Sequence, residues 1–330
     1  MKILERFLKI IVALCLALTA LSVFAYFYDY HTLGNHSITH AAGAVYDPNS
    51  FASDLSEGYG WNRMDGFGFN NAKVIEHPTV VVMGGSHIQA LQIPQRENVV
   101  GRLNERFGND FAYNVGESGH YIDSLVYYLD GACSYFSPKY AVLDLNDLYP
   151  DEQDMKEILD GTRGETPLLS DKGAIIRDVR KYIPATGVLL IQLQNWLGKS
   201  SAGKAGGDSL YTPEYYSLRK KFFAYAAETA EKHGTQIILL YHPASYHVEK
   251  DGALVFTDSD QDYLKFSAMC DELGITVCST KQETIDMYKH EHVLPNGFAN
   301  TSLGSGHFNK YGHEAMADVL AGTITELEAQ

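Results

Sequence analysis

From residue 79 onward, short apolar runs alternate with longer stretches in which apolar residues recur at helical spacing. The first run, Thr79-Val80-Val81-Val82-Met83, is rich in β-branched residues, as expected for a parallel strand buried on both faces. Such alternation predicts an α/β fold, with helices on both faces of a three-layer, doubly wound parallel sheet. Further strands are predicted over 111–115, 140–145, 236–241 and 275–278, and helices over 96–107, 121–129, 212–233, 263–273 and from about 309 onward.

The first thirty residues contain an apolar segment preceded by basic residues. An uncharged run extends from Ile10 to about Tyr28, close to the roughly 20 residues that a helix needs to cross a bilayer. Basic residues before the run and none directly after it predict a cytoplasmic N-terminus and a chain that continues outside, in the periplasm or the extracellular space. We therefore expect residues 1–30 to form a cytoplasmic stub and a transmembrane signal-anchor. A cleaved signal peptide is the alternative, because Val23-Phe24-Ala25 fits a cleavage site.

The rest of the chain divides into a lead-in and one large domain. Residues 31–75 are rich in Gly, Asn, Ser and aromatic residues and contain few periodic segments, so we interpret them as a lead-in segment. Residues 76–330 are predicted to form the α/β domain. The stretch from about 150 to 210 interrupts the rhythm of strands and helices and is predicted to be a mainly helical insertion.

Composition excludes several classes of partner. The formal net charge of -15 argues against nucleic acid, because binding there relies on basic residues that neutralise phosphates. Residues 198–205 nearly match a phosphate-binding loop, but they lack its final Ser or Thr and no helix pattern follows, so no nucleotide is expected. No metal or other cofactor is predicted, since the four cysteines form no CxxC pair and His290-Glu291-His292 lies in a charged segment expected to be a solvated loop.

Two cysteines allow two interpretations. Cys270 and Cys278 flank a predicted turn between a helix and a strand. They either pair as a disulfide in an oxidising compartment or remain separate buried thiols.

Chemically useful residues follow the predicted strands. Because ligands of an open parallel sheet bind beyond the carboxyl ends of its strands, we looked for polar residues there. Ser86 follows the first strand, Gly119 the second and Asn146 the third, while His307 precedes the last helix. A serine with a histidine as general base is the pair that ester cleavage requires. The N–H groups of Ser86 and Gly119 and the Asn146 amide would form an oxyanion hole.

Two further histidines are candidate pocket residues. His87 directly follows Ser86, and His242 ends the fourth predicted strand. A surface role for His87 and a structural role for His242 are the alternatives.

This ordered set resembles the SGNH (GDSL-type) hydrolase family, whose four named residues correspond to Ser86, Gly119, Asn146 and His307. The segment Asn62 to Phe67 is similar to one found ahead of the nucleophile in membrane-anchored members. The resemblance covers residues 60–330 and implies a flavodoxin-like sheet and a serine-based esterase or acyltransferase.

Two positions depart from the family pattern. Gly85 stands where the first block usually has an aspartate, and Gly304 stands where the last block has the aspartate that orients the histidine. The acid that would orient His307 is therefore missing from its expected place. Three explanations remain open: a Ser–His dyad oriented by a backbone carbonyl, an acid from elsewhere in the chain, or a non-catalytic relative.

The leading hypothesis is hydrolysis of an oxygen ester. The residues indicate the ester chemistry, whereas the location and the family resemblance imply an O-acyl group on a surface glycan as substrate. Acyl transfer to a sugar hydroxyl is a close variant. The alternative from another class is a non-catalytic SGNH-like protein that binds a glycan or a protein partner.

Overall fold

The computed structural model describes residues 2–28, 38–52, 57–164, 212–243 and 245–330. Its centre is one sheet of five parallel strands, in the order β11-β8-β7-β5-β6, so the predicted parallel sheet is confirmed. The five predicted strands agree with the observed ones to within one residue at nearly every end. The strands are β5 (Val80–Met83), β6 (Ala112–Asn114), β7 (Tyr140–Leu145), β8 (Gln236–Tyr241) and β11 (Thr276–Ser279).

The strand order creates a switch point beside the first strand of the sheet. The chain passes from β5 to β6 on one side of β5 and then crosses to β7 on the other side. This is the flavodoxin-like order, in which ligands bind where the order reverses. The loops that follow β5 and β7 are therefore neighbours at the carboxyl edge of the sheet.

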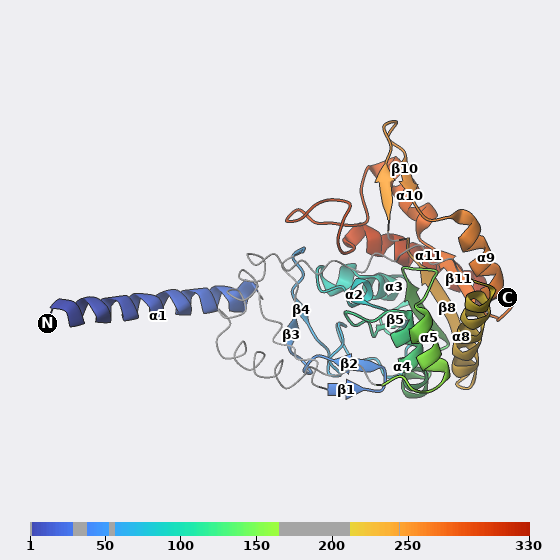
Figure 1. Cartoon of the computed structure of the whole chain (residues 1–330), viewed down its shortest axis with the longest axis horizontal. Helices are drawn as coiled ribbons and strands as arrows, with labels where there is room; N and C mark the ends of the chain where they lie inside the picture. The colour runs from blue at the N-terminus through green and yellow to red at the C-terminus, as the bar shows by residue number, and fades with distance from the viewer. Residues whose placement is uncertain (1, 29–37, 53–56, 165–211, 244) are drawn as a thin grey trace.

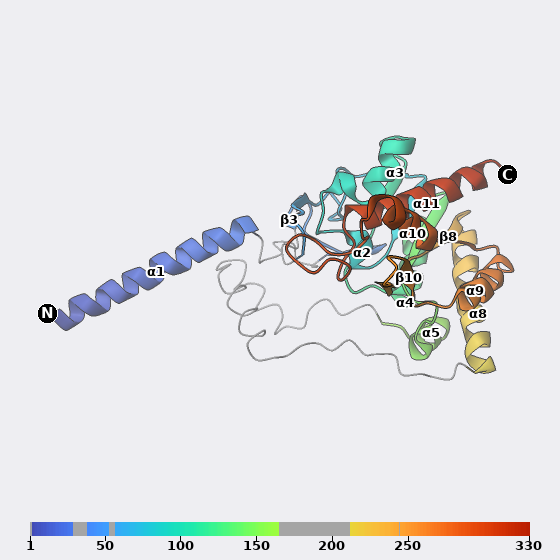
Figure 2. The same ribbon diagram turned by 90° about the horizontal axis from the view of Figure 1, so that it is seen from above.

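Helices cover both faces of this sheet and give three layers (Figures 1 and 2). One face packs against helices α4, α8 and α9, and the other against α3 and α11. The predicted helices are confirmed, although most ends shift by up to three residues and α4 extends seven residues beyond its predicted end at 129. Their bounds are α3 (Val99–Phe107), α4 (Ile122–Phe136), α8 (Pro213–Glu231), α9 (Asp260–Asp271) and α11 (Lys310–Glu328).

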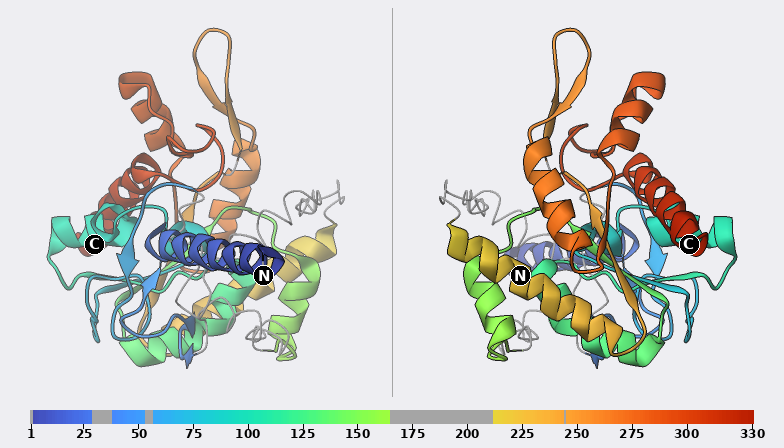
Figure 3. Two further views of the ribbon diagram at one scale, coloured as in Figure 1. Left: turned by 90° about the vertical axis from the view of Figure 1, so that its left-hand side faces the viewer. Right: turned by 90° about the vertical axis from the view of Figure 1, so that its right-hand side faces the viewer.

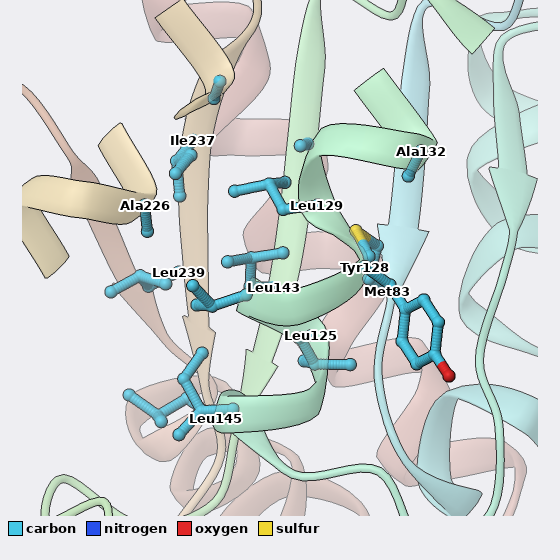
Figure 4. Packing of buried hydrophobic residues seen from close by; sticks show 14 of the residues in the cluster. Met83, Leu125, Tyr128, Leu129, Ala132, Leu143, Leu145, Ala226, Ile237 and Leu239 are labelled. Atoms are coloured by element: carbon cyan, nitrogen blue, oxygen red, sulfur yellow. The ribbon is translucent and has the colours of Figure 1, made fainter. Parts of the chain in front are cut away.

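The alternation of side chains along each strand divides the core in two. Figure 4 shows Leu143 and Leu239 on neighbouring strands packed against Leu125 and Leu129 of α4. The residues next to them along the strands, such as Val142, point to the other face and belong to a second cluster with α3 and α11. Both faces are apolar because both are covered, which explains the continuous runs of apolar residues in the strands.

Polar caps fix where the main helices begin. The Thr212 side chain accepts a hydrogen bond from the N–H of Tyr215, and Pro213 occupies the first turn of α8, where its missing N–H costs no hydrogen bond. Asn309 caps α11 by accepting from the N–H of Tyr311 at 2.9 Å. The cap lies two residues after His307, and α11 begins one residue later, so the cap helps to place the histidine.

The N-terminal segment forms one helix, α1 (Lys2–Tyr28), whose residues Leu4–Phe24 are long and apolar enough to cross a membrane. It extends away from the α/β domain as a single rod (Figure 1). A signal sequence would have the same length and composition, so both interpretations of this segment remain.

Smaller elements lie at the carboxyl edge and in the lead-in. A hairpin of β9 and β10 projects from the domain beside α10 (Figure 3), and two short hairpins, β1–β2 and β3–β4, form the lead-in. The sequence did not predict these hairpins or α10. Their bounds are β1 (Ile38–His40), β2 (Gly43–Val45), β3 (Phe51–Ala52), β4 (Asn62–Arg63), α2 (Ser86–Gln89), η1 (Gln95–Glu97), α5 (Glu152–Leu159), β9 (Tyr246–Val248), β10 (Leu254–Phe256) and α10 (Lys281–Glu291).

The cysteine pair and residues 290–292 have clear outcomes in the structure, whereas most of the predicted insertion is not tested. Cys270 and Cys278 are separate buried thiols, and burial raises the pKa of each to about 12. The segment 290–292 is exposed, as predicted. The prediction of a loop was wrong, because helical hydrogen bonds continue up to His292 and the segment forms the end of α10. Of the predicted insertion, α5 is observed, while 165–211, with the loop at 198–205, lies outside the described residues.

Candidate active site

Ser86 lies at the switch point of the sheet, directly after β5. It is the first residue of the short helix α2, so its N–H has no acceptor within the helix. The preceding turn fits tightly between two neighbours. A Cβ added to Gly84 would lie 2.7 Å from the Asp144 Cβ on β7, and one added to Gly85 would lie 2.7 Å from the His120 carbonyl oxygen. No side chain fits at position 85 without movement, which explains the absence of the family's aspartate there.

His307 joins the serine to an acid that the sequence did not reveal. Its Nε2 lies 2.9 Å from Ser86 Oγ, and its Nδ1 lies 2.5 Å from Glu57 Oε2. The backbone N–H of His307 donates to the same Glu57 oxygen at 2.9 Å. Ser86, His307 and Glu57 therefore form a continuous serine–imidazole–carboxylate contact chain. Of the three explanations for the missing acid, the geometry favours an acid from elsewhere in the chain.

Glu57 belongs to the lead-in and is held beside the histidine loop. The Asn300 side chain accepts from the N–H of Gly58 at 2.9 Å and donates to its carbonyl oxygen at 3.2 Å. This reciprocal pair ties the residue after Glu57 to the loop that carries His307. Gly304, the position of the family's aspartate, has a φ of +81°, a conformation that favours glycine over any acid.

The candidate oxyanion-hole residues gather around Ser86. The close approach of the His120 carbonyl to Gly85 places the loop containing Gly119 against the nucleophile turn. Asn146 directly follows β7, the strand that neighbours β5, and its side chain is exposed at the carboxyl edge. The predicted set of Ser86, Gly119 and Asn146 thus lies on adjacent loops, while their role as hydrogen-bond donors stays a prediction.

A buried acid–histidine pair supports the loop of Gly119, and sequence reasoning missed it. His120 Nε2 lies 3.2 Å from Glu117 Oε2, and both side chains are buried. The N–H of Glu117 donates to the Gly84 carbonyl at 2.8 Å. The His120 ring stacks on Tyr128 of α4, with ring centroids 5.4 Å apart. The residues on either side of Gly119 are therefore fixed to the nucleophile turn and to α4.

Amide side chains of the lead-in hold the backbone that leaves α2. Asn62 Nδ2 donates to the carbonyls of Leu91 and Ile93, and Asn70 Nδ2 donates to that of Gln89 at 2.6 Å. Asp65 accepts from two backbone N–H groups, from an Asn71 amide and from the Tyr113 hydroxyl on β6. The segment that resembles the family's lead-in is thus a scaffold for the candidate site.

The two candidate pocket histidines lie behind the contact chain. The His87 ring centroid is 5.4 Å from that of His307 and 5.1 Å from that of His242. His87 is only partly buried and accepts a hydrogen bond from the N–H of Phe308 at 3.3 Å. His242 is buried, with Nε2 2.9 Å from Asp144 Oδ1. Although part of the His87 side chain reaches solvent, loss of water around its ring keeps its pKa well below the ordinary value, and nearby histidines lower the pKa further.

A fourth histidine in this region makes stability depend on pH. His313 is fully buried and accepts from the N–H of Val99 at 3.3 Å, and burial together with Arg102 lowers its pKa to about 3 from 6.5. Between those values the unfolded chain binds a proton that the folded chain does not. The free energy of unfolding therefore falls as pH decreases from about 6.5 towards 3.

We expect this contribution to reach about 2 kcal/mol at pH 5 relative to pH 7, at about 1.4 kcal/mol per pH unit. Denaturant unfolding at both pH values measures it, with His313→Asn as the comparison because asparagine keeps an acceptor for Val99. The variant should lose about 2 kcal/mol less than the parent between pH 7 and pH 5. Equal losses in both proteins would show that His313 is not responsible.

The strand order and the positions of Ser86 and His307 in the fold are those that the family resemblance implies. A sheet in flavodoxin-like order, a serine after its first strand and a histidine before its last helix match the SGNH fold. No protein-family model matches the chain, and no curated protein matches it either.

Solved structures of GDSL-type proteins and esterases are similar to this chain over about three quarters of its length. A lipolytic G-D-S-L family member from Veillonella parvula has 15% identity, with 74% of this chain and 97% of that chain covered and a TM-score of 0.40. A psychrotrophic esterase from Pseudoalteromonas sp. has 12% identity, 76% and 100% coverage and a TM-score of 0.41. An acetylxylan esterase from Geobacillus stearothermophilus has 12% identity, 76% and 95% coverage and a TM-score of 0.41.

Proposed function

We propose that this chain is a serine esterase of SGNH type that acts on O-acyl esters. The observation that carries the proposal is the continuous contact chain from Ser86 Oγ through His307 to Glu57. A hydroxyl, an imidazole and a carboxylate in this order form the arrangement that activates a serine as a nucleophile.

In the first half of the reaction, Ser86 Oγ attacks the carbonyl carbon of the ester while His307 Nε2 accepts the hydroxyl proton. Glu57 accepts a hydrogen bond from His307 Nδ1–H and stabilises the imidazolium that forms. The negative oxygen of the tetrahedral intermediate accepts hydrogen bonds from the N–H groups of Ser86 and Gly119 and from the Asn146 amide. The bond between the carbonyl carbon and the alkoxide oxygen then breaks as His307 Nε2 donates its proton to that oxygen, so the alcohol leaves and the acyl group remains on Ser86 Oγ.

In the second half, an incoming hydroxyl removes the acyl group. His307 accepts a proton from water or from an acceptor alcohol, whose oxygen attacks the acyl carbon, and the proton returns to Ser86 Oγ as the product leaves. Water gives hydrolysis, whereas a sugar hydroxyl gives transfer of the acyl group. The same three side chains serve both outcomes.

The N-terminal helix bears on where the protein acts and on which class of substrate it meets. We propose that α1 anchors the chain, because Leu4–Phe24 is long enough to span a bilayer. The basic residues before the apolar run favour a cytoplasmic N-terminus and an α/β domain outside the cytoplasm. An anchored esterase on the outer side works naturally on a surface polymer, and an O-acylated glycan is the substrate class that fits this location.

The non-catalytic alternative was favoured by the missing acid at position 304. Because the Glu57 carboxylate lies 2.5 Å from His307 Nδ1, the missing acid at position 304 no longer favours the non-catalytic alternative. Gly85 has a steric reason in the close approach of the His120 carbonyl and carries no argument about activity.

Covalent labelling with a fluorophosphonate probe tests the proposal directly. The full chain in detergent micelles should be labelled, because such probes react with an activated serine. Ser86→Ala should lose the label completely, whereas Ser217→Ala, a change at an exposed serine of α8, should keep it. Absence of labelling in a parent protein shown to be folded would reject the esterase proposal.

A further inference from the structure

The segment that follows Glu57 packs closely, backbone against backbone, on the loop that follows α2. The N–H groups of Tyr59 and Gly60 both donate to the Gln92 carbonyl, at 3.0 and 2.8 Å. A Cβ added to Gly58 would lie 2.3 Å from the Gln92 carbonyl oxygen, and one added to Gly60 would lie 2.2 Å from that of Leu91. Both glycines therefore face the loop at backbone contact distance.

Tyr59 and Trp61, which follow Gly58 and Gly60, have side chains that are exposed to solvent. Tyr59 is 66% exposed and Trp61 is 51% exposed, and Phe51 on the paired strand β3 is 47% exposed. The Phe51 and Trp61 rings meet edge to face, with centroids 6.2 Å apart. Exposure of large aromatic rings in a cluster is a mark of a binding surface rather than of a folding core.

Trp61 also forms one wall of an open cavity of about 1050 Å³. This volume is at the upper end of the range for small-molecule sites. The rest of the lining is mixed: it includes the apolar residues Ile75, Pro94 and Val100 as well as polar and charged ones such as Gln95, Lys73, Arg96 and Glu105. A lipid surface would meet many charges here, whereas a sugar offers hydroxyls for the polar wall and an apolar ring face for the indole.

The basic residues of the cavity each have an acidic neighbour. Lys73 lies 2.5 Å from Asp110, Arg102 lies 3.4 Å from Glu314, and Arg96 lies 3.8 Å from Glu97. Because each basic group has an acidic neighbour, the cavity does not select an anion. Hydroxyl groups, which both donate and accept hydrogen bonds, match such a mixed lining.

The cavity lies close to the candidate active site without sharing its reacting residues. Four residues of extended chain, from Glu57 to Trp61, span at most about 13 Å. Asn62 and Asn70 line the cavity and also hold the backbone that follows the Ser86 helix. A polymer that crosses the active site is therefore within reach of Trp61 a few sugar rings away.

We propose that the cavity beside Trp61 binds a neutral glycan chain, with one sugar ring stacked on the indole, while an ester on a neighbouring sugar enters the site at Ser86. This inference rests on the proposed esterase function and names its substrate class. The test below measures binding in a Ser86→Ala protein, so its result does not depend on whether the serine reacts.

Intrinsic fluorescence gives a local readout, because the chain has only two tryptophans, Trp61 and Trp196. In the full chain carrying Ser86→Ala and Trp196→Phe, held in detergent micelles, Trp61 is the sole tryptophan, and excitation at wavelengths that tyrosine does not absorb reports on it alone. Titration with O-acetylated xylan, its de-acetylated form and dextran should give a saturable blue shift with at least one of these neutral polysaccharides. No saturable shift with any of the three would overturn the proposal.

Substitution then assigns the binding to the indole. In the Ser86→Ala protein, calorimetry should show that Trp61→Ala weakens binding by about tenfold or more. Sugar binding would bury the exposed half of the indole ring, and alanine removes this favourable burial of apolar surface. Trp61→Phe, which keeps an aromatic face, should weaken it less. Tyr225→Ala, at an exposed aromatic of α8, is the matched control and should bind like the parent.

The competing occupant is the membrane itself, because tryptophan and tyrosine favour the bilayer interface. The sole-tryptophan protein in lipid nanodiscs containing brominated phosphatidylcholine measures this contact by quenching. Strong quenching of Trp61 without any polysaccharide-dependent shift would overturn the glycan proposal in favour of a membrane-facing surface. Fluorophosphonate labelling of the parent decides the esterase function separately, so the two proposals fail independently.

Discussion

Replacing Ser86 with alanine, replacing His307 with alanine, and making both changes together should each lower kcat by about 10⁶-fold. The expected losses are equal because the two residues act as one unit, with His307 Nε2 2.9 Å from Ser86 Oγ. Once the serine hydroxyl is gone, the histidine has no proton to accept, so its removal costs nothing more. The measurement is kcat for an acetyl ester, with thermal melting as a check on folding.

Matched controls separate this unit from unrelated effects of substitution. Ser217→Ala and His77→Ala change exposed residues of the same two types and should leave kcat within a factor of about two. If the single changes at Ser86 and His307 instead cost modest factors that multiply in the double variant, the two side chains act independently. The Ser–His unit would then be rejected.

The sheet and half of the site could be predicted because both depend on local patterns. Buried parallel strands need continuous β-branched and apolar runs, so 79–83 and 140–145 are visible in sequence. Ser86 and Asn146 follow such runs directly, and the flavodoxin-like strand order makes their strands neighbours. Their proximity at the switch point therefore follows from the predicted fold.

Glu57 could not be predicted, for a physical reason. It lies 250 residues before His307 in the chain and in a segment without helical or strand periodicity. Its contact with His307 depends on how the lead-in folds back over the domain, and no local pattern encodes that path. The family resemblance directed attention to position 304, where the observed backbone conformation favours glycine.

The hydrogen bonds of the lead-in amides could not be predicted from the sequence either. Asn62 and Asn70 bind backbone carbonyls of residues 89–93, and a carbonyl is present at every residue whatever the sequence. Sequence therefore reveals the donors but not their acceptors. Glu57 and these amides lie on one continuous segment, so the same stretch of chain supplies the acid and fixes the loop after the nucleophile helix.

Glu57→Gln should lower kcat by about 10⁴-fold with little change in KM. Glutamine keeps the shape of the side chain, but its amide N–H₂ can donate to His307 Nδ1 and so leave the proton on Nε2. The histidine then presents a donor to Ser86 Oγ and cannot accept its proton. The rate of fluorophosphonate labelling should fall with kcat, because both report on the activated serine.

A structural role for Glu57 would give a different result. Its carboxylate also accepts from the His307 backbone N–H at 2.9 Å, so its loss affects the loop as well as the ring. Glu57→Asp keeps the charge on a shorter side chain, and Glu283→Gln, at an exposed residue of α10, controls for the chemical change. If Glu57→Gln keeps kcat within tenfold of the parent while melting at a lower temperature, the carboxylate only holds the loop. A Ser–His dyad oriented by other groups would then be the working unit, because the hydroxyl would be activated without the charge at position 57.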